Sequence, residues 1–280
     1  MKLKKSLKKW LGGILMILEV KDLKKYYDDK LAVDKVNIQV EKSEIFSLLG
    51  PNGAGKTTTI KCILGMRKKD SGEIYLNGTY SYLPEKKELY KNLTVQKMLE
   101  ITPSISNNFS LEKAYNFLKE FEIPLKEKIS KLSYGMLTQL YLTIVLSEDV
   151  DIYFLDEPTE GLDPLKRFRL FDIIRNLSMN GKTFFYTSHV LSEVEKIADK
   201  VAIMVNGQIA LMDYLDNIKE KYVACAVDKT TTLNGYLYKQ TEKENVYIIE
   251  KDKINCNYET ATFDMIFEAI TKNQIRGDKK

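Results

Sequence analysis

Residues 50–58 read Gly-Pro-Asn-Gly-Ala-Gly-Lys-Thr-Thr and match the pattern G-x-x-x-x-G-K-[ST]. The glycines let the backbone wrap closely around an anion, so that successive N–H groups point at phosphate oxygens. The Lys56 ammonium would neutralise phosphate charge, and the Thr57 hydroxyl would ligate Mg²⁺. The loop stands between a buried apolar run and a helix-compatible run, as this pattern requires. A phosphate site is therefore predicted at Gly50, Pro51, Asn52, Gly53, Ala54, Gly55, Lys56, Thr57 and Thr58.

A second candidate is the acidic pair Asp156-Glu157, which directly follows the apolar run 152–155. Asp156, at the tip of a buried strand, can reach the shell of a Mg²⁺ ion. Glu157 could polarise a water molecule for attack on a γ-phosphate. Acidic residues often follow strands merely as helix caps. The pair indicates a catalytic site here because a phosphate loop lies upstream in the same chain.

His189 is the single histidine of the chain, and it follows the apolar run 183–186. A lone histidine is usually a satisfied structural residue. This one ends a predicted strand roughly thirty residues beyond the acidic pair, in a chain with a phosphate loop. We therefore interpret it as a sensor of the γ-phosphate.

The pattern of apolar residues indicates the strands and helices that must position these side chains. Residues 32–40 alternate as a half-buried strand would, residues 45–49 resemble a buried strand, and residues 73–78 form a strand bounded by turn residues. Residues 86–150 are predicted to be mostly helical, with breaks at Pro103 and Pro124. Buried strands then alternate with helices at 152–156, 164–179, 183–187, 190–198 and 201–205, which predicts a parallel sheet with crossover helices. Asn206-Gly207 marks a hairpin turn.

These elements predict an α/β fold with a P-loop NTPase core built on a parallel sheet. An antiparallel β subdomain, a helical subdomain and a small C-terminal α+β appendage complete it. We expect a basic amphipathic extension at 1–15, an ATPase domain at 16–212 with its helical subdomain at about 86–150, and a C-terminal subdomain at 213–280. The last of these combines short strands with a final helix at 262–271.

Composition limits the possible functions. Of the 280 residues, 44% are apolar and 29% are charged, enough for a sizeable core. A net charge of +4 is small for a nucleic-acid binder, so no nucleic-acid partner is expected. Cys62, Cys225 and Cys256 show no paired spacing, which indicates a reducing cytoplasm and disfavours a disulfide framework. The longest apolar run, 10–18, is shorter than the about 20 residues that span a bilayer, so another chain must supply any membrane spans.

Residues 1–15 form a short basic amphipathic pattern that could lie on an anionic membrane surface. Its apolar positions at helical spacing are Leu3, Leu7, Trp10, Leu11 and Ile14. The segment also fits an upstream start before Met16 or a disordered tail. A signal peptide is disfavoured, because Gly12-Gly13 break the apolar run and no small-residue cleavage site follows.

Taken together, the motifs resemble those of the ATP-binding-cassette (ABC) transporter ATPases over nearly all of residues 16–212. Leu-Ser-Tyr-Gly-Met at 132–136 resembles the signature motif of this family, normally Leu-Ser-Gly-Gly-Gln. Gly161, Leu162 and Asp163 resemble its D-loop, and the segment 187–189 resembles its switch histidine. Tyr27 stands where the family places the aromatic residue that stacks on adenine, with Tyr26 as the alternative.

The resemblance implies ATP and Mg²⁺ as cofactors, hydrolysis of ATP to ADP and phosphate, and a head-to-tail dimer. Each ATP would lie between the phosphate loop of one subunit and the signature residues Ser133, Gly135 and Met136 of the other. ATP would close the dimer and hydrolysis would reopen it. The second ATPase subunit could be identical or non-identical. A separate transmembrane permease would hold the pair at the cytoplasmic face of the membrane as a peripheral protein.

The chain departs from the family pattern at several positions. Glu85 stands where many relatives have the Q-loop glutamine, and it could still contact Mg²⁺ or its water. Tyr134 and Met136 replace Gly and Gln of the signature, and Glu160 replaces the usual serine before the D-loop. These variations resemble ATPases of drug, peptide and lantibiotic exporters.

Two features of the C-terminal region also favour export. The region after 213 lacks the long barrel of sugar importers, and segment 261–268 resembles the terminal helix of exporters. The helical region at 85–99 would dock the permease. The chain is thus predicted to power export of a drug, peptide or lipid-like substrate.

Two alternatives stay open at this point. A soluble ABC ATPase acting on ribosomes or chromosomes usually carries two cassettes or long heptad segments, and this sequence has one phosphate loop and no heptad run. A slow-turnover ATP-binding regulator would suit the altered signature. The identity of the substrate is not readable, because selectivity is expected to reside in the permease.

Overall fold

The computed structural model describes residues 16–254 and 257–277, so the predicted amphipathic segment 1–15 lies outside the described residues. The chain divides into two compact units. The first runs up to Val20 and includes Ile38–Ile45 and Ile74–Thr187. The second includes Lys21–Asn37, Phe46–Glu73 and the chain from Ser188 onward. The domain boundaries predicted from the sequence stay predictions.

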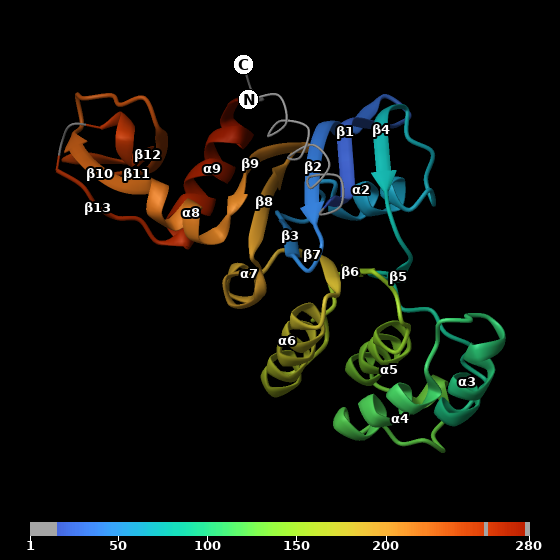
Figure 1. The fold of residues 1–280 in the computed structure, drawn as a ribbon. Coiled ribbons are helices and arrows are strands. Elements are labelled where there is room, and N and C mark those ends of the chain that lie inside the picture. The colour runs from blue at the N-terminus through green and yellow to red at the C-terminus, as the bar shows by residue number, and fades with distance from the viewer. Residues whose placement is uncertain (1–15, 255–256, 278–280) are drawn as a thin grey trace, which may run out of the picture. The chain divides into compact units, whose positions relative to one another are not determined.

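The N-terminal sheet has three strands in the order β2-β1-β4 (Figure 1). They are β1 (Met16–Tyr27), β2 (Lys30–Glu41) and β4 (Ser71–Leu76). In β2 every second residue from Val36 to Val40 is buried, which confirms the predicted half-buried strand there. Lys35 has a φ of 48°, and this irregularity shifts the alternation by one residue between Val33 and Val36.

In the first unit three strands neighbour one another in parallel. They are, in order, β5 (Tyr80–Leu83), β6 (Ile152–Asp156) and β7 (Thr183–Ser188). Every residue of β6 and β7 is buried, as expected for strands covered on both faces, and both strands occur where the apolar runs predict them. The sequence did not predict β5, because its 4 residues are too few and too polar to stand out from a loop.

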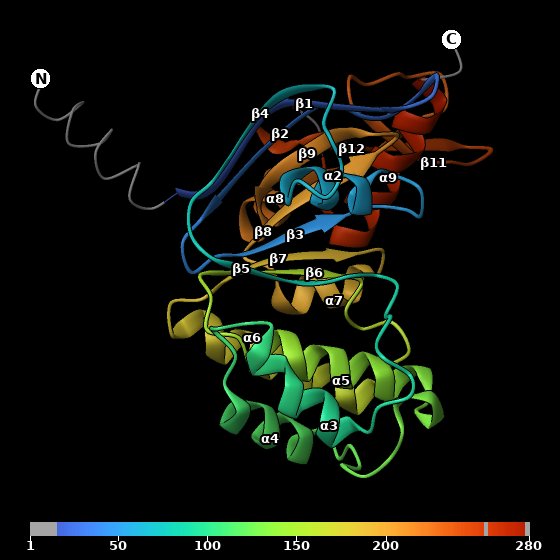
Figure 2. The ribbon, with the colours of Figure 1, turned by 90° about the vertical axis from the view of Figure 1, so that its right-hand side faces the viewer.

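The helices of the first unit lie between these strands along the chain, and α3, α4 and α5 gather into one helical group (Figure 2). Their bounds are α3 (Val95–Ile101), η1 (Thr102–Ser104), α4 (Leu111–Glu120), η2 (Ile129–Lys131), α5 (Tyr134–Leu146) and α6 (Pro164–Met179). The prediction of a mostly helical segment at 86–150 is confirmed from Val95 onward and is wrong for 86–94, which is irregular. Proline explains one break, since α3 ends at Ile101 and Pro103 lies in η1.

The second unit contains its own strand group. Its elements are β3 (Ile45–Leu49), α2 (Lys56–Ile63), α7 (Leu191–Ile197), β8 (Lys200–Val205) and β9 (Gln208–Tyr214). Strand β3 pairs in parallel with β8, and β8 pairs antiparallel with β9. Asn206 and Gly207 have φ angles of 48° and 82°, so the predicted hairpin turn is confirmed with the left-handed backbone that such a turn requires.

The C-terminal part of the second unit is a small sheet with a long helix against it (Figure 1). It comprises α8 (Leu215–Lys221), β10 (Tyr222–Asp228), β11 (Tyr236–Gln240), β12 (Glu244–Glu250), η3 (Lys251–Lys253), β13 (Glu259–Thr260) and α9 (Phe263–Gly277). The strand order is β11-β12-β10-β13. Helix α9 contacts β11 and β12 and also β8 and β9, so its apolar face joins the small sheet to the rest of the unit. Among the helices that the structure describes, none is long and apolar enough to cross a membrane.

The cysteines differ from expectation at one residue. Cys62 is a buried free thiol, and burial raises its pKa. Cys225 is disulfide-bonded, a bond that the spacing of the cysteines did not indicate. Spacing along the chain could not reveal the bond, because a disulfide depends on the distance between two Cα atoms in space.

Candidate functional site

The phosphate loop connects the end of β3 to the first turn of α2 in the second unit. Gly55 caps α2 with a φ of 107°, a left-handed conformation that residues with a Cβ rarely adopt. A Cβ at this position would lie 2.6 Å from the carbonyl oxygen of Ala32, closer than real Cβ contacts. The turn therefore requires glycine. No side chain of the capping residue bonds to the first N–H groups of α2, so the start of this helix suits an anion.

Lys56 is the first residue of α2, and only 5% of it is exposed. Its Nζ donates to the carbonyl oxygens of Gly50 at 2.7 Å and of Pro51 at 3.2 Å. The ammonium is thus folded back onto the start of the loop. Thr57 and Thr58 follow in the same turn and are half-buried. The loop residues predicted to bind phosphate form one continuous turn with the helix that follows.

The acidic pair lies at the end of β6 in the first unit. Asp156 is fully buried, and Glu157 is 9% exposed. In the parallel register Asp156 lies opposite Thr187 of β7, and the Thr187 hydroxyl donates to Asp156 Oδ1 at 2.6 Å. The same hydroxyl oxygen accepts a hydrogen bond from the Glu157 backbone N–H at 3.1 Å. One buried hydroxyl therefore positions the carboxylate of the first residue and the backbone of the second.

The backbone of Glu157 is strained. Its φ of 48° lies in the left-handed region, which costs a residue with a side chain about 1–3 kcal/mol. Its carbonyl oxygen accepts from Lys87 Nζ at 3.4 Å and from the N–H of Glu160 at 3.3 Å. Hydrogen bonds on both sides of the peptide hold the conformation, and strain of this kind concentrates at functional sites.

Lys87 is a buried residue beside the acidic pair that the sequence pattern did not predict. It is 7% exposed, and its Nζ also donates to the carbonyl oxygen of Glu85 at 2.8 Å. Burial lowers the pKa of Lys87, while the charges of Glu160, Asp156, Glu85 and Glu157 act in the opposite direction. Because the run Lys86-Lys87-Glu88 looks like ordinary charged surface, no local signal could have identified this lysine.

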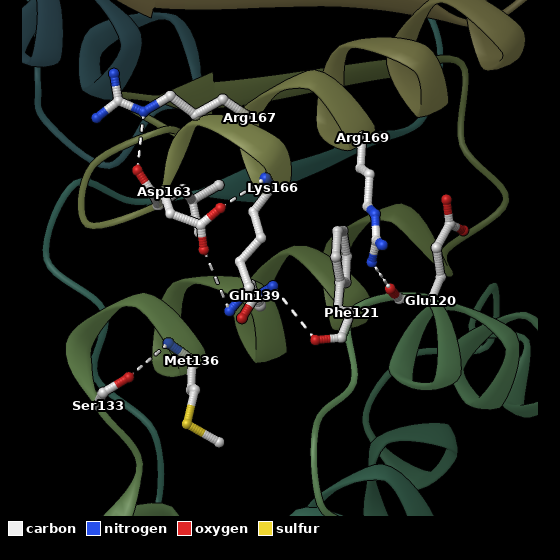
Figure 3. A network of polar contacts seen from close by, with 10 residues as sticks. Glu120, Phe121, Ser133, Met136, Gln139, Asp163, Lys166, Arg167 and Arg169 are labelled. Atoms are coloured by element: carbon white, nitrogen blue, oxygen red, sulfur yellow. Dashed lines mark hydrogen bonds and ion pairs between the residues drawn. The ribbon is translucent and has the colours of Figure 1, made fainter.

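The signature and D-loop residues lie at the starts of two helices of the first unit (Figure 3). Ser133 caps α5, and its Oγ accepts from the Met136 N–H at 3.2 Å. Asp163 caps α6, and its carboxylate accepts from the Lys166 N–H at 3.0 Å. That hydrogen bond is the main reason why the pKa of Asp163 lies below its usual range. Both helices therefore begin with a fixed polar cap.

Further hydrogen bonds, also drawn in Figure 3, lie at the start of α6 and at the end of α4. Arg167 Nε donates to the carbonyl oxygen of Leu162 at 2.9 Å, and Arg169 donates to that of Glu120 at 2.8 Å. Gln139 Nε2, fully buried on α5, donates to the carbonyl oxygen of Phe121 at 3.4 Å. Backbone oxygens at the end of α4 thus connect to α5 and to α6.

His189 and Tyr27 lie in the second unit, as the phosphate loop does. His189 is exposed directly after β7, and the buried Ser188 before it accepts from the Val190 N–H at 2.9 Å. Tyr27 is the last residue of β1 and is 42% exposed, with Lys25 Nζ 5.6 Å from its ring centre. The contacts of His189 with phosphate and of Tyr27 with adenine stay predictions.

The residues predicted to hold Mg²⁺ fit that ion chemically. Thr57 offers a hydroxyl oxygen, Asp156 a buried carboxylate and Glu85 an exposed carboxylate after β5. Magnesium prefers such oxygen donors, and it is commonly bound through one or two carboxylates together with substrate phosphates. Thr57 belongs to the second unit, and the two carboxylates belong to the first.

Comparison with known proteins also indicates a nucleotide-binding protein of this kind. The profile of the family described as ABC transporter matches residues 33–160. The Nod factor export ATP-binding protein I of Burkholderia pseudomallei is 34% identical over 213 residues, which cover 68% of this chain and 68% of that protein. This chain belongs to the ABC transporter family. It is an ABC ATPase with an ATP-binding cassette.

Two further comparisons support the assignment of the cassette. An uncharacterised ABC transporter ATP-binding protein of Synechocystis sp. is 32% identical over 233 residues, which span 76% of this chain and 66% of that relative. A solved ATP-binding subunit of an ABC transporter superposes with a TM-score of 0.66 at 29% identity, covering 72% of this chain and 92% of that one. The predicted α/β fold with its parallel core sheet is thereby confirmed. A solved dimeric bacterial ABC transporter cassette shares the fold, with a TM-score of 0.65 at 20% identity over 71% of this chain and 98% of that one.

The position of Thr187 leads to a first prediction for the cassette. Replacing Thr187 with valine removes the donor to the buried Asp156 carboxylate and the acceptor for the Glu157 N–H. We expect the ATPase rate to fall about tenfold, because a hydrogen bond to a charged group contributes about 1.5–3 kcal/mol. Thr187→Ser retains the hydroxyl and should keep most of the activity. Steady-state ATPase assays with melting temperatures would check this, and a fully active valine variant would contradict it.

Proposed function

We propose that this cassette is the ATP-hydrolysing subunit of an exporter and that it powers a separate membrane permease. The observation that carries the proposal is the acidic pair at the end of β6. There the buried Asp156 and the strained Glu157 are held by one Thr187 hydroxyl. A purely structural helix cap would need neither a buried carboxylate nor a left-handed glutamate. This arrangement suits a metal-bound nucleotide and a directed water molecule.

Each residue then has a role in the proposed reaction. The backbone of 50–55, the α2 N-terminus and Lys56 bind the phosphates. Glu157 takes a proton from the attacking water, and His189 contacts the γ-phosphate. Thr57, Asp156 and Glu85 would hold Mg²⁺, which neutralises phosphate charge when bound. The adenine would stack on Tyr27.

The second half of each ATP site would come from another cassette in a head-to-tail dimer. Ser133 and Gly135 lie at the start of α5, where a hydroxyl, backbone N–H groups and the positive helix end suit a γ-phosphate. Met136 follows in the same turn and would complete the contact. ATP would stabilise the closed dimer because it gains these contacts only there. Hydrolysis would then release the two subunits, which could be identical or non-identical.

Export is the direction that we propose, with a drug, peptide or lipid-like molecule as the substrate. It is supported by the 34% identity to the Burkholderia pseudomallei Nod factor export protein. The C-terminal sheet with α9, residues 222–277, also supports it, because it is a small appendage rather than a long regulatory barrel. The cassette would act at the cytoplasmic face of the membrane as a peripheral subunit.

We place the permease-docking surface at the irregular segment before α3. Tyr90 is 65% exposed there. The Ser130 N–H donates to the carbonyl oxygen of Lys91 in this segment at 3.1 Å, and the Gln96 N–H, in the first turn of α3, donates to that of Leu125 at 2.9 Å. Leu125 is itself 37% exposed, so two apolar side chains lie on neighbouring backbone segments. Exposed aromatic anchors of this kind are common at interface centres.

The docking surface gives a second prediction. We expect Tyr90→Ala, combined with Leu125→Ser, to reduce transport about tenfold or more while basal ATPase activity persists, because hot-spot residues cost at least about 2 kcal/mol. Met179→Ser is the matched control, since Met179 at the end of α6 is an apolar residue that is 82% exposed. Transport in membrane vesicles and ATPase in detergent would be measured together. Unchanged transport in the double variant would contradict the docking site.

The proposed function as a whole is tested by affinity capture of the full chain from detergent-solubilised membranes of its native cell. We expect a multi-span membrane protein to copurify in near-stoichiometric amount. Ribosomal or chromosomal proteins without a membrane partner would contradict the transporter and favour the soluble ATPase. A cassette that copurifies with a permease but does not turn over ATP would instead be a regulator.

A further inference from the structure

Two residues that depart from the family pattern contact each other in this chain. The Tyr134 hydroxyl donates to Glu160 Oε2 at 2.6 Å. Tyr134 follows the capping Ser133 at the start of α5, and Glu160 immediately precedes Gly161 of the D-loop. The sequence presents them as separate departures 26 positions apart. In the structure they form one hydrogen-bonded pair, which indicates that each is explained by the other.

Two other contacts hold the same segments together. The fully buried Thr138 hydroxyl lies 3.1 Å from the carbonyl oxygen of Tyr134 and 3.1 Å from that of Glu160, and it can donate to either. The backbones of Gly135 and Gly161 also approach closely, since a Cβ on Gly135 would lie 2.4 Å from the Gly161 carbonyl oxygen. The start of α5 and the D-loop are therefore in direct contact through backbone and side chains.

Glu160 is also connected to Glu157 of the acidic pair. Its N–H donates to the carbonyl oxygen of Glu157 at 3.3 Å, and the same oxygen accepts from Lys87 Nζ at 3.4 Å. Tyr134 itself remains a hydrogen-bond donor, because burial and its bond to Glu160 raise the pKa of its hydroxyl. Glu160 thus connects the two residues, because its N–H bonds to the backbone of Glu157 and its carboxylate bonds to the Tyr134 hydroxyl.

We propose that Tyr134 and Glu160 are a pair of positioning residues that couples the two half-sites of one cassette. In this role the pair sets the orientation of Ser133 and Gly135, which act on the ATP of the partner subunit. It ties that orientation to Glu157, which acts on the ATP of its own subunit. The inference rests on the proposed head-to-tail dimer and deepens it. Breaking the pair should slow turnover in the dimer while leaving ATP binding to the phosphate loop unchanged.

A double-mutant cycle on the full chain tests the pair. The variants are Tyr134→Phe, Glu160→Ala and their combination, with Tyr115→Phe on α4 as the control for loss of a tyrosine hydroxyl. We expect each single variant to lower kcat about fivefold, as the loss of one hydrogen bond predicts, with the Kd for ATP unchanged. The combined variant should resemble the single variants rather than reach the about 25-fold loss of independent effects. Glu160→Gln keeps an acceptor oxygen and should recover part of the rate.

The outcomes separate the pair from the function on which it rests. Wild-type kcat in Tyr134→Phe, multiplicative losses in the combined variant, or equal rates for Glu160→Ala and Glu160→Gln would overturn the coupling. ATP-dependent dimerisation of Glu157→Gln, followed by size-exclusion chromatography, tests the dimer independently. A Glu157→Gln protein that stays monomeric with saturating ATP would contradict the dimer itself, and the coupling with it.

Discussion

Replacing Glu157 with glutamine is expected to lower the ATPase rate by about 10²–10⁴-fold while ATP binding persists, because a positioned general base contributes that much. Glutamine has nearly the same shape but cannot take a proton from the attacking water. The backbone contacts of this residue, to Thr187 on one side and to Lys87 and Glu160 on the other, do not involve the carboxylate. The variant should therefore fold normally and stop at the chemical step.

Glu122→Gln is a closely matched control for this variant. Glu122 also has a left-handed backbone, with a φ of 59°, but it is exposed and lies after α4. The same replacement there should leave turnover unchanged. Nucleotide affinity from fluorescence titration and turnover from phosphate release would be measured on both variants. Near-normal hydrolysis by Glu157→Gln would exclude Glu157 as the base.

Replacing Lys56 with alanine is expected to weaken ATP binding and to lower turnover by about 10²-fold or more, since removing one preorganised charge or donor at a phosphoryl group costs this much. The Lys56 ammonium lies over the phosphate loop through its bonds to the carbonyl oxygens of Gly50 and Pro51. Without the ammonium, the loop keeps its N–H groups but loses the positive charge. This variant should fail at binding, whereas Glu157→Gln should fail only at chemistry.

Lys61→Ala controls for a lost lysine, because Lys61 lies in the last turn of the same helix. Its replacement should leave both ATP affinity and turnover near those of the parent. Melting temperatures of both lysine variants would show whether the hydrogen bonds from Lys56 to the loop carbonyl oxygens contribute to the stability of the fold. An Lys56→Ala protein with unchanged affinity for ATP would rule out the predicted role of Lys56 in phosphate binding.

Local patterns in the sequence were sufficient for the core elements. Strands β6 and β7 are fully buried and therefore read as continuous apolar runs, and α6 begins with a capping Asp163 followed by a proline. The phosphate loop is contiguous in the chain, so its glycines and Lys56 could be recognised together. In each case neighbours in sequence are also neighbours in space.

Tertiary structure alone decided the contacts around the acidic pair. Thr187 lies 31 positions from Asp156 and reaches it only because β6 and β7 pair in parallel with those two residues in register. Lys87 is buried although its local sequence looks like charged surface, and Tyr134 meets Glu160 across 26 positions. Sequence patterns predicted which residues carry chemistry. The register and packing of distant segments decided which side chains hold them in place, because those distances depend on the whole fold.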